Sequence, residues 1–193
     1  MSTFGRTAVV KTLLEFSRFN VNASNTNKPR TVFYEACADA YPDVMPLLLD
    51  NGANIEAKNT EGKTPLIRAS SRGHENIVFM FLDAGADINA RNKINGSTSL
   101  HKTASYGHTA VIQLLLEREA KIDASNNHGK TPLHYAVIKG FWEAVKLLAE
   151  RGAELKALQK NRLTALHLTV MENHEKVMKS VIVVSEGLST SFA

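Results

Sequence analysis

Seven histidines are the residues of this chain best suited to acid–base or metal chemistry. An imidazole exchanges a proton near neutral pH, and its ring nitrogens are common metal ligands. Zinc sites on helices favour two histidines at close spacing on one face, supported by cysteine or carboxylate ligands. No two histidines here have that spacing, and the single cysteine, Cys37, falls at an apolar position beside Ala36. We therefore expect no catalytic residue, no metal site and no cofactor.

Three of the histidines belong to a motif that begins a helix. Residues 131–134 read Thr-Pro-Leu-His, and His101, His134 and His167 each stand three residues after a threonine. A threonine hydroxyl can cap the first turn, and proline is well tolerated at the first helical position. A histidine at the third position can reach back to the cap, as glutamate does in a capping box. We interpret these histidines as parts of helix starts rather than as a site.

The other histidines divide between a second repeated position and one loop. His74, His108 and His174 each follow the short turn between two predicted helices. His128 alone is off the pattern, in a loop that ends at Gly129. Six histidines thus have structural explanations, and His128 is expected to be exposed.

The threonines of the motif recur at a fixed period. Thr31, Thr64, Thr98, Thr131 and Thr164 are spaced 33, 34, 33 and 33 residues apart. A period in this range is typical of repeat proteins, in which each unit buries its apolar face against its neighbours. Helical apolar patterns follow each threonine and each interhelix turn. The chain is therefore predicted to be a single domain of stacked helix pairs.

Composition agrees with a soluble protein and excludes several classes. The chain has 193 residues, is 44% hydrophobic and carries a formal charge of +4. This mild excess does not indicate a nucleic-acid partner. No run approaches the roughly 18 apolar residues of a membrane span. The N-terminus lacks the apolar core of a signal peptide. A lone cysteine suits a reducing compartment, so we expect a cytoplasmic or nuclear protein with no membrane partner.

The segment 59–90 carries the most complete copy of the repeated unit, and it resembles the ankyrin repeat. Its matching positions are Asn59, Gly62, Thr64, Pro65, Leu66, Ala69, Gly73, His74, Ile77, Val78, Phe81, Leu82, Gly85, Ala86, Asp87, Ile88, Asn89 and Ala90. Five recognisable copies and an N-terminal half-repeat cover nearly the whole chain. The resemblance implies an all-α ankyrin-repeat solenoid of stacked antiparallel helix pairs with projecting β-hairpin-like loops.

The repeats predict the boundaries of the units. Residues 1–25 form the half-repeat or cap, 26–58, 59–91, 92–125 and 126–158 are repeats, 159–184 is a C-terminal repeat, and 185–193 is a tail. Pro46, about one turn into a helix, predicts a bent or 3₁₀-like first turn. Glu119 replaces a helix-ending glycine, and a left-handed non-glycine residue costs roughly 1 kcal/mol, so a different local turn is expected there. Val183 and Val184 fall on a side that a further repeat would cover, so the C-terminal end could mediate oligomerisation.

The positions outside the framework lie at loop tips and at the exposed ends of the first helices. In ankyrin proteins this surface is the concave partner-binding groove, here called the concave face. Basic residues outnumber acidic ones on it, which favours an acidic protein partner. Five apolar residues on it (Ile94, Tyr106, Ile138, Leu163 and Met171) predict an interface patch. The candidate binding residues are Lys28, Arg30, Lys63, Arg72, Ile94, Tyr106, His128, Lys130, Ile138, Lys139, Leu163 and Met171.

The resemblance favours a protein–protein interaction scaffold or adaptor, and two alternatives remain open. The first is an enzyme or small-molecule-binding protein that uses His128, Tyr106, Lys102 and Lys139 as acid–base groups. A deep pocket with titratable residues would support it, and a shallow groove would count against it. The second is a nucleic-acid-associated regulator, for which steep salt dependence of binding would be the signature.

Overall fold

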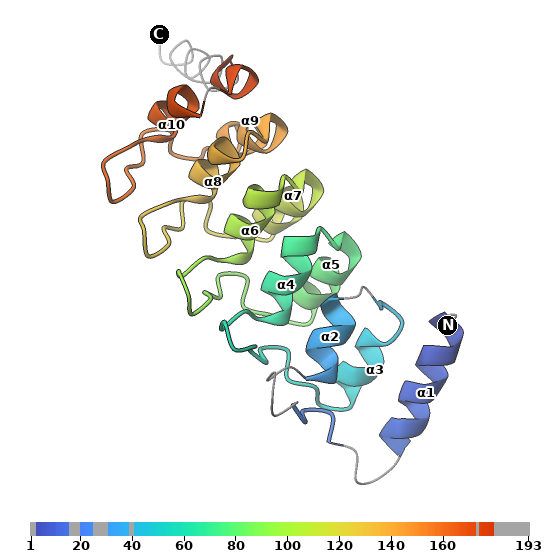
Figure 1. Cartoon of the computed structure of the whole chain (residues 1–193). Coiled ribbons are helices and arrows are strands. Elements are labelled where there is room, and N and C mark those ends of the chain that lie inside the picture. The colour runs from blue at the N-terminus through green and yellow to red at the C-terminus, as the bar shows by residue number, and fades with distance from the viewer. Residues whose placement is uncertain (1–2, 16–19, 25–30, 39–40, 173, 180–193) are drawn as a thin grey trace.

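A computed structural model describes residues 3–15, 20–24, 31–38, 41–172 and 174–179 (Figure 1). Residues 175–179 are helical, and the other helices in this part of the chain are α1 (Thr3–Glu15), α2 (Val32–Ala38), α3 (Met45–Asp50), α4 (Pro65–Arg72), α5 (Glu75–Asp83), α6 (Ser99–Tyr106), α7 (Thr109–Glu117), α8 (Pro132–Ile138), α9 (Trp142–Glu150) and α10 (Ala165–Met171).

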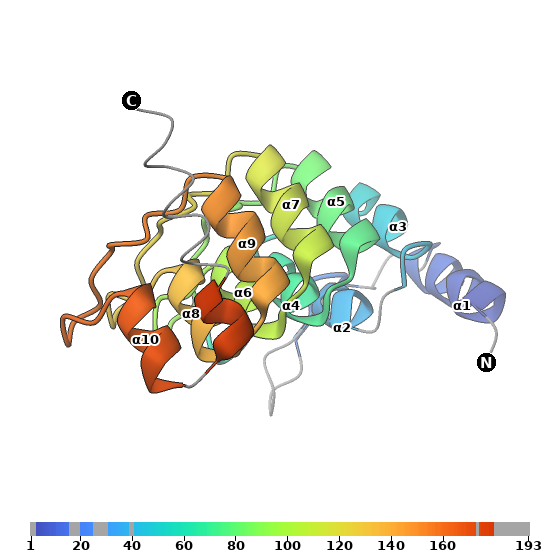
Figure 2. The ribbon, with the colours of Figure 1, turned by 90° about the horizontal axis from the view of Figure 1, so that it is seen from above.

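The helices form two rows that run along the stack. An inner row contains α2, α4, α6, α8 and α10, and an outer row contains α3, α5, α7 and α9 (Figure 2). Each inner helix packs on the next, and loops project from one side of the stack (Figure 1). The described residues contain no named strand, only an isolated antiparallel bridge between Ser24 and Thr31. The predicted all-α solenoid of stacked helix pairs is confirmed.

The helix starts have the predicted capping boxes. The backbone N–H of Thr98 donates to Nδ1 of His101 at 3.2 Å, and the Thr131–His134 and Thr164–His167 pairs repeat this bond. Thr64 caps α4 with its side chain, which accepts from the backbone of Ile67. These bonds satisfy N–H groups that an isolated helix end leaves without partners. The repeated threonines and histidines are therefore framework residues, as the sequence indicated.

His101 also joins two neighbouring units. Because its Nδ1 accepts from Thr98, the ring proton of the neutral form lies on Nε2, which donates to the carbonyl of Lys130 at 2.9 Å. Burial lowers the pKa of His101 to about 4. His134 occupies the same position one unit later, and burial lowers its pKa too. Its buried Nε2 has no hydrogen-bond partner among the described residues. The histidine at this motif position therefore takes part in the helix cap of both units. Within the described part of the chain, only His101 also forms a hydrogen bond to the next unit.

The turn between inner and outer helices depends on glycine for two separate reasons. Gly107 ends α6 with φ of 72°, in the left-handed region that disfavours a side chain. A Cβ at Gly107 would also lie 2.5 Å from Cδ1 of Phe141 on the next unit. Gly85, after α5, has φ of 82° but open space around its would-be Cβ.

This difference gives a paired test of what the interhelix glycine contributes. Gly85→Ala should lower the free energy of unfolding by about 1 kcal/mol, because only backbone strain opposes it. Gly107→Ala should cost at least about 1 kcal/mol more, because the Phe141 ring must also move. Urea unfolding of the two variants measures the difference. Equal losses would show that close approach between units does not constrain this position.

One local expectation was wrong. Glu119 adopts φ of 63°, so the turn after α7 keeps the left-handed geometry that glycine gives elsewhere. Arg162 does the same in the last projecting loop. Packing of the stack therefore imposes the turn despite its conformational cost. Pro46 lies in the first turn of α3, which begins at Met45. Just before this helix, the Val44 N–H donates to the Tyr41 carbonyl at 3.2 Å, a bond between residues three apart that agrees with the 3₁₀-like turn expected there.

The core runs continuously between the two rows. Leu115 of α7 is fully buried, whereas its neighbours Leu114 and Leu116 are only half-buried. In α1, Val10 and Leu14 pack against the core, while Val9 and Leu13 are exposed, so only half of the predicted apolar stripe is used. The boundaries of the units, and the capping role of residues 1–25, stay predictions.

Candidate protein-binding surface

The projecting loops that begin at Asn59, Asn92 and Asn126 are shaped by the side chain of that asparagine. In the loop 126–130, the Asn126 side-chain oxygen accepts from the backbone N–H of His128 at 2.9 Å and of Lys130 at 3.1 Å. Asn59 holds residues 61 and 63 in the same way. Side-chain bonds of this kind fix a turn without any neighbouring strand. Each of these three loops therefore presents its tip in a defined conformation.

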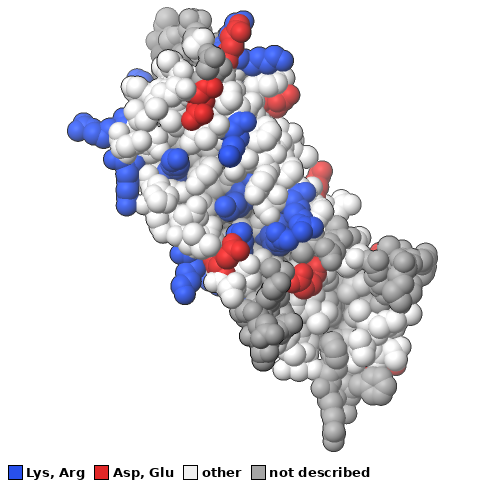
Figure 3. Space-filling model, in the orientation of Figure 1, with Lys and Arg blue, Asp and Glu red and all other residues white. Residues whose placement is uncertain are grey.

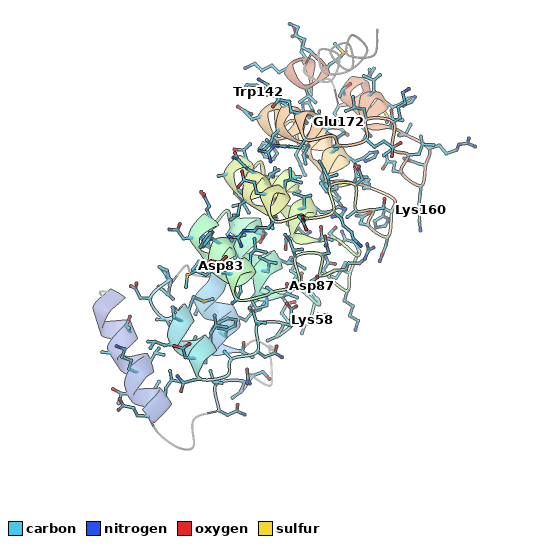
Figure 4. All side chains as sticks on the ribbon, turned by 180° about the vertical axis from the view of Figure 1, so that it is seen from behind. Lys58, Asp83, Asp87, Trp142, Lys160 and Glu172 are labelled. Atoms are coloured by element: carbon cyan, nitrogen blue, oxygen red, sulfur yellow. The ribbon has the colours of Figure 1, made fainter. Side chains whose placement is uncertain are left out.

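Backbone bonds then tie successive loop tips together. Lys93 donates to the carbonyl of Glu61 at 3.0 Å, Asn127 to that of Asn95 at 2.9 Å, and Lys160 to that of His128 at 3.0 Å. The loop that carries Lys160 is the last projecting loop among the described residues. It projects away from Trp142, the first residue of the outer helix α9 (Figure 4). These links fix the spacing between loops, so the surface they form is preorganised.

A small polar network positions Lys130 on this surface. The Asn126 amide donates to the Tyr135 hydroxyl at 2.9 Å. The Lys130 ammonium lies 5.9 Å from the centre of the Tyr135 ring, within the range of a cation–π contact. Lys130 is half-buried as a result, and its charge is held near the inner helices rather than extended into solvent.

The structure brings five of the candidate residues into one open groove of about 470 Å³ between the loops and inner helices of the last two units. They are His128, Lys130, Ile138, Leu163 and Met171. The other lining residues are Gln159, Lys160, Asn161, Leu168 and Glu172. We call this the α8–α10 groove. Its lining combines four apolar side chains with basic residues on the loops.

The remaining candidates lie outside this groove. Ile94 and Tyr106 are exposed, and the Tyr106 ring stacks on His108 with ring centres 6.1 Å apart. Two candidates that do line the groove, Ile138 and Leu163, were predicted to be exposed, but they are half-buried and pack against the core. Lys63 is half-buried, Arg72 and Lys139 are exposed, and Lys28 and Arg30 lie outside the described residues. The apolar candidates therefore occupy separate places, with one cluster at α8–α10.

Sequence reasoning missed Arg68 as a surface cation. Arg68 lies four residues after Thr64, as Lys102 does after Thr98, so both occupy the same position on adjacent inner helices. Burial and the nearby Lys63 ammonium lower the pKa of Lys102, and Glu61 opposes this. Figure 3 shows Lys and Arg side chains over the α4 and α6 part of this face. Aligning the repeats by their threonines would have revealed this pair.

The acid–base alternative gains no geometric support. The groove that contains His128 does not include Tyr106, Lys102 or Lys139. Among the described residues, no three His, Cys, Asp or Glu side chains lie close enough together to hold a metal ion. The same part of the chain contains no helix that is both long and apolar enough to span a membrane.

Stacked helix pairs, repeated capping boxes and linked projecting loops define an ankyrin-type repeat protein. The sequence matches the family "Ankyrin repeats (3 copies)" over residues 1–92 and 89–159. The chain belongs to the ankyrin-repeat family. Ankyrin repeats generally mediate protein–protein interactions and are typically non-enzymatic. The number of repeats that we count from the sequence stays a prediction.

The curated relatives are much longer proteins. The chain is 42% identical over 65 residues to human "Ankyrin repeat and KH domain-containing protein 1" and to "Ankyrin repeat and KH domain-containing protein mask" of Drosophila melanogaster. It is 36% identical over 92 residues to "Ankyrin repeat and KH domain-containing protein mask-1" of Caenorhabditis elegans. These matches cover 34% and 46% of this chain, but only 2% and 3% of the relatives.

Proposed function

We propose that this protein is an interaction scaffold or adaptor that binds a segment of another protein in the α8–α10 groove. The observation that carries the proposal is the groove itself, where four apolar side chains meet His128, two lysines (Lys130 and Lys160) and one carboxylate, Glu172. Apolar anchors surrounded by polar groups are the usual anatomy of a protein interface. A partner segment with an apolar side chain flanked by acidic residues fits this lining best.

The architecture supports binding by a preformed surface. The loop carrying His128 is held by Asn126 and is tied to the next loop through Lys160. Little conformational entropy is then lost when a partner docks, which leaves more of the contact energy for affinity. The groove is open rather than enclosed, as suits a polypeptide segment better than a small metabolite.

The C-terminal end of the inner row offers a separate surface. Leu133 and Val137 of α8 are 0% exposed because α10 covers them, whereas the equivalent Leu166 and Val170 of α10 are 46% and 66% exposed. Oligomerisation through the C-terminal end of the stack stays a prediction. Val183 and Val184 lie outside the described residues.

Affinity capture with matched variants tests the proposed groove. Met171→Asp places a charge among the apolar lining residues, and Met171 is exposed enough for the fold to tolerate it. We expect recovery of directly bound partner proteins, measured by quantitative mass spectrometry, to fall about tenfold or more. Phe79→Asp is the control, since Phe79 is also an exposed apolar residue but belongs to the outer helix α5.

A specific outcome would rule out this site. Thermal melting first establishes that both variants are folded. If Met171→Asp retains the same partners as the unmodified protein, or if Phe79→Asp loses them equally, the α8–α10 groove is not the binding site.

A further inference from the structure

Three basic residues lie on or beside the packed inner helices α4 and α6, and two of them, Lys63 and Lys102, are close enough to interact electrostatically. Lys63 immediately precedes the cap of α4, Arg68 lies in its second turn, and Lys102 occupies the matching position of α6. Helices α4 and α6 pack directly on each other, so residues at matching positions are neighbours across the contact. We call these three residues the α4–α6 basic cluster.

The cluster has more positive charge than its surroundings compensate. Glu61 pairs with Lys63 at 2.5 Å. Arg68 and Lys102 form no ion pair within the described ranges, and the buried Nε of Arg68 has no hydrogen-bond partner there. Within the described part of the chain, one carboxylate forms an ion pair with these three cations, so two of the positive charges have no ionic partner there. The depressed pKa of Lys102 agrees with this, since its causes are burial and the charge of Lys63.

An uncompensated cluster of this composition fits a doubly negative group. Arginine presents several N–H donors in a planar array suited to phosphate or carboxylate oxygens, and lysine adds a mobile point charge. Half-burial of Lys63, Arg68 and Lys102 reduces screening by water, which strengthens the attraction for an anion.

We propose that the α4–α6 basic cluster binds a doubly negative group on the partner polypeptide, either one phosphorylated side chain or two adjacent carboxylates. The inference rests on the proposed function for its biological setting, because it places a second anchor on the same concave face. The α8–α10 groove lies two helix contacts further along the inner row. That separation is roughly 18 Å, or about five to six residues of extended chain, between the anionic group and the apolar anchor.

Titration followed by amide NMR tests the cluster without the unidentified partner. The probes are a phosphoserine tripeptide flanked by alanines, the same peptide with unmodified serine, and a tetrapeptide with two adjacent glutamates. At least one doubly negative peptide should give saturable shifts in residues 61–72 and 97–106, and the serine peptide should not. The peptide that binds more tightly assigns the source of the anion.

Single variants assign the binding to particular side chains. Arg68→Gln and Lys102→Gln should each raise the dissociation constant about tenfold, because each removes a charge-assisted contact. Lys146→Gln, on the outer helix α9, removes one exposed positive charge elsewhere and should leave the constant unchanged. Absence of saturation with both doubly negative peptides would overturn the proposal. Equal effects of Arg68→Gln and Lys146→Gln would do the same.

The two proposals fail independently. Met171→Asp should leave binding of the doubly negative peptides unchanged, because Met171 lies in the α8–α10 groove. If the peptides bind through Arg68 while Met171→Asp has no effect on partner capture, the groove proposal fails and the anion site stands. Loss of partner capture in Met171→Asp, with no peptide binding at α4–α6, gives the reverse result.

Discussion

Replacing Leu115 by alanine should lower the free energy of unfolding by about 2–5 kcal/mol. Leu115 lies in α7, near the middle of the outer row, and is fully buried in the continuous core. Helix α7 packs against α5, α6 and α9, so a cavity at Leu115 weakens contacts within its unit and with both adjacent units. In a stack stabilised by contacts between neighbours, such a central loss affects the whole array.

Chemical denaturation followed by circular dichroism measures this loss. Gln113→Ala is the matched control, because Gln113 lies on the exposed side of the same helix and alanine favours helix formation. Its free energy of unfolding should change by less than about 0.5 kcal/mol. An unchanged melt for Leu115→Ala would contradict the stacked-core packing described for α7.

Acidification should destabilise the stack through His101. Its pKa is about 4 in the folded chain, against an ordinary value of 6.5. The unfolded chain therefore binds more protons between these values, and stability falls as pH falls. The contribution of His101 is fully present above about pH 6.5. Its loss amounts to about 2 kcal/mol by pH 5 and about 3 kcal/mol by pH 4.

The structural cause is the burial of the His101 ring, which the hydrogen bond to the Lys130 carbonyl only partly opposes. Protonation places a proton on Nδ1, which accepts from the Thr98 N–H, and puts a charge into a buried site. The lowered pKa of His134 acts in the same direction. Glutamine also suits a capping box, so it is the replacement for His101 that best keeps the helix start. In His101→Gln, the fall in unfolding free energy from pH 7 to pH 5 should be about 2 kcal/mol smaller than in the unmodified protein.

Urea titrations at a series of pH values measure this dependence. His128→Gln is the control, because it removes a histidine from an exposed loop. A His101→Gln variant with the same pH dependence as the unmodified protein would show that the buried ring does not control acid stability.

Much of the fold could be predicted because its determinants are local and repeated. A threonine cap and a histidine three residues later satisfy one helix end within four residues, as Thr98 and His101 show. Because this motif recurs at a nearly constant period, each unit has the same apolar face, and the units stack to bury these faces against one another. The wrong prediction was a local one at Glu119, where stacking overrode the preference of a single residue.

The candidate site was predictable only in part. The repeated motif indicated which residues are not needed for the fold, and five of these residues line the α8–α10 groove. It did not show that Ile138 and Leu163 are half-buried while Ile94 and Tyr106 lie elsewhere, because exposure depends on the neighbouring unit. Arg68 has no ion pair among the described residues, and its own segment could not show this, since ion pairs also form between units.

The sequence by itself determined the repeating helix pair, its capped starts, its glycine turns and the period at which variable residues are displayed. These features depend on interactions within a few residues, so a single segment contains all the information they need. Only the tertiary structure decided which partners act between units. The bond from His101 to the Lys130 carbonyl, the contact of Gly107 with Phe141 and the α4–α6 basic cluster all join residues about 30 positions apart. Their distances follow from how one unit packs on the next, which no single repeat specifies.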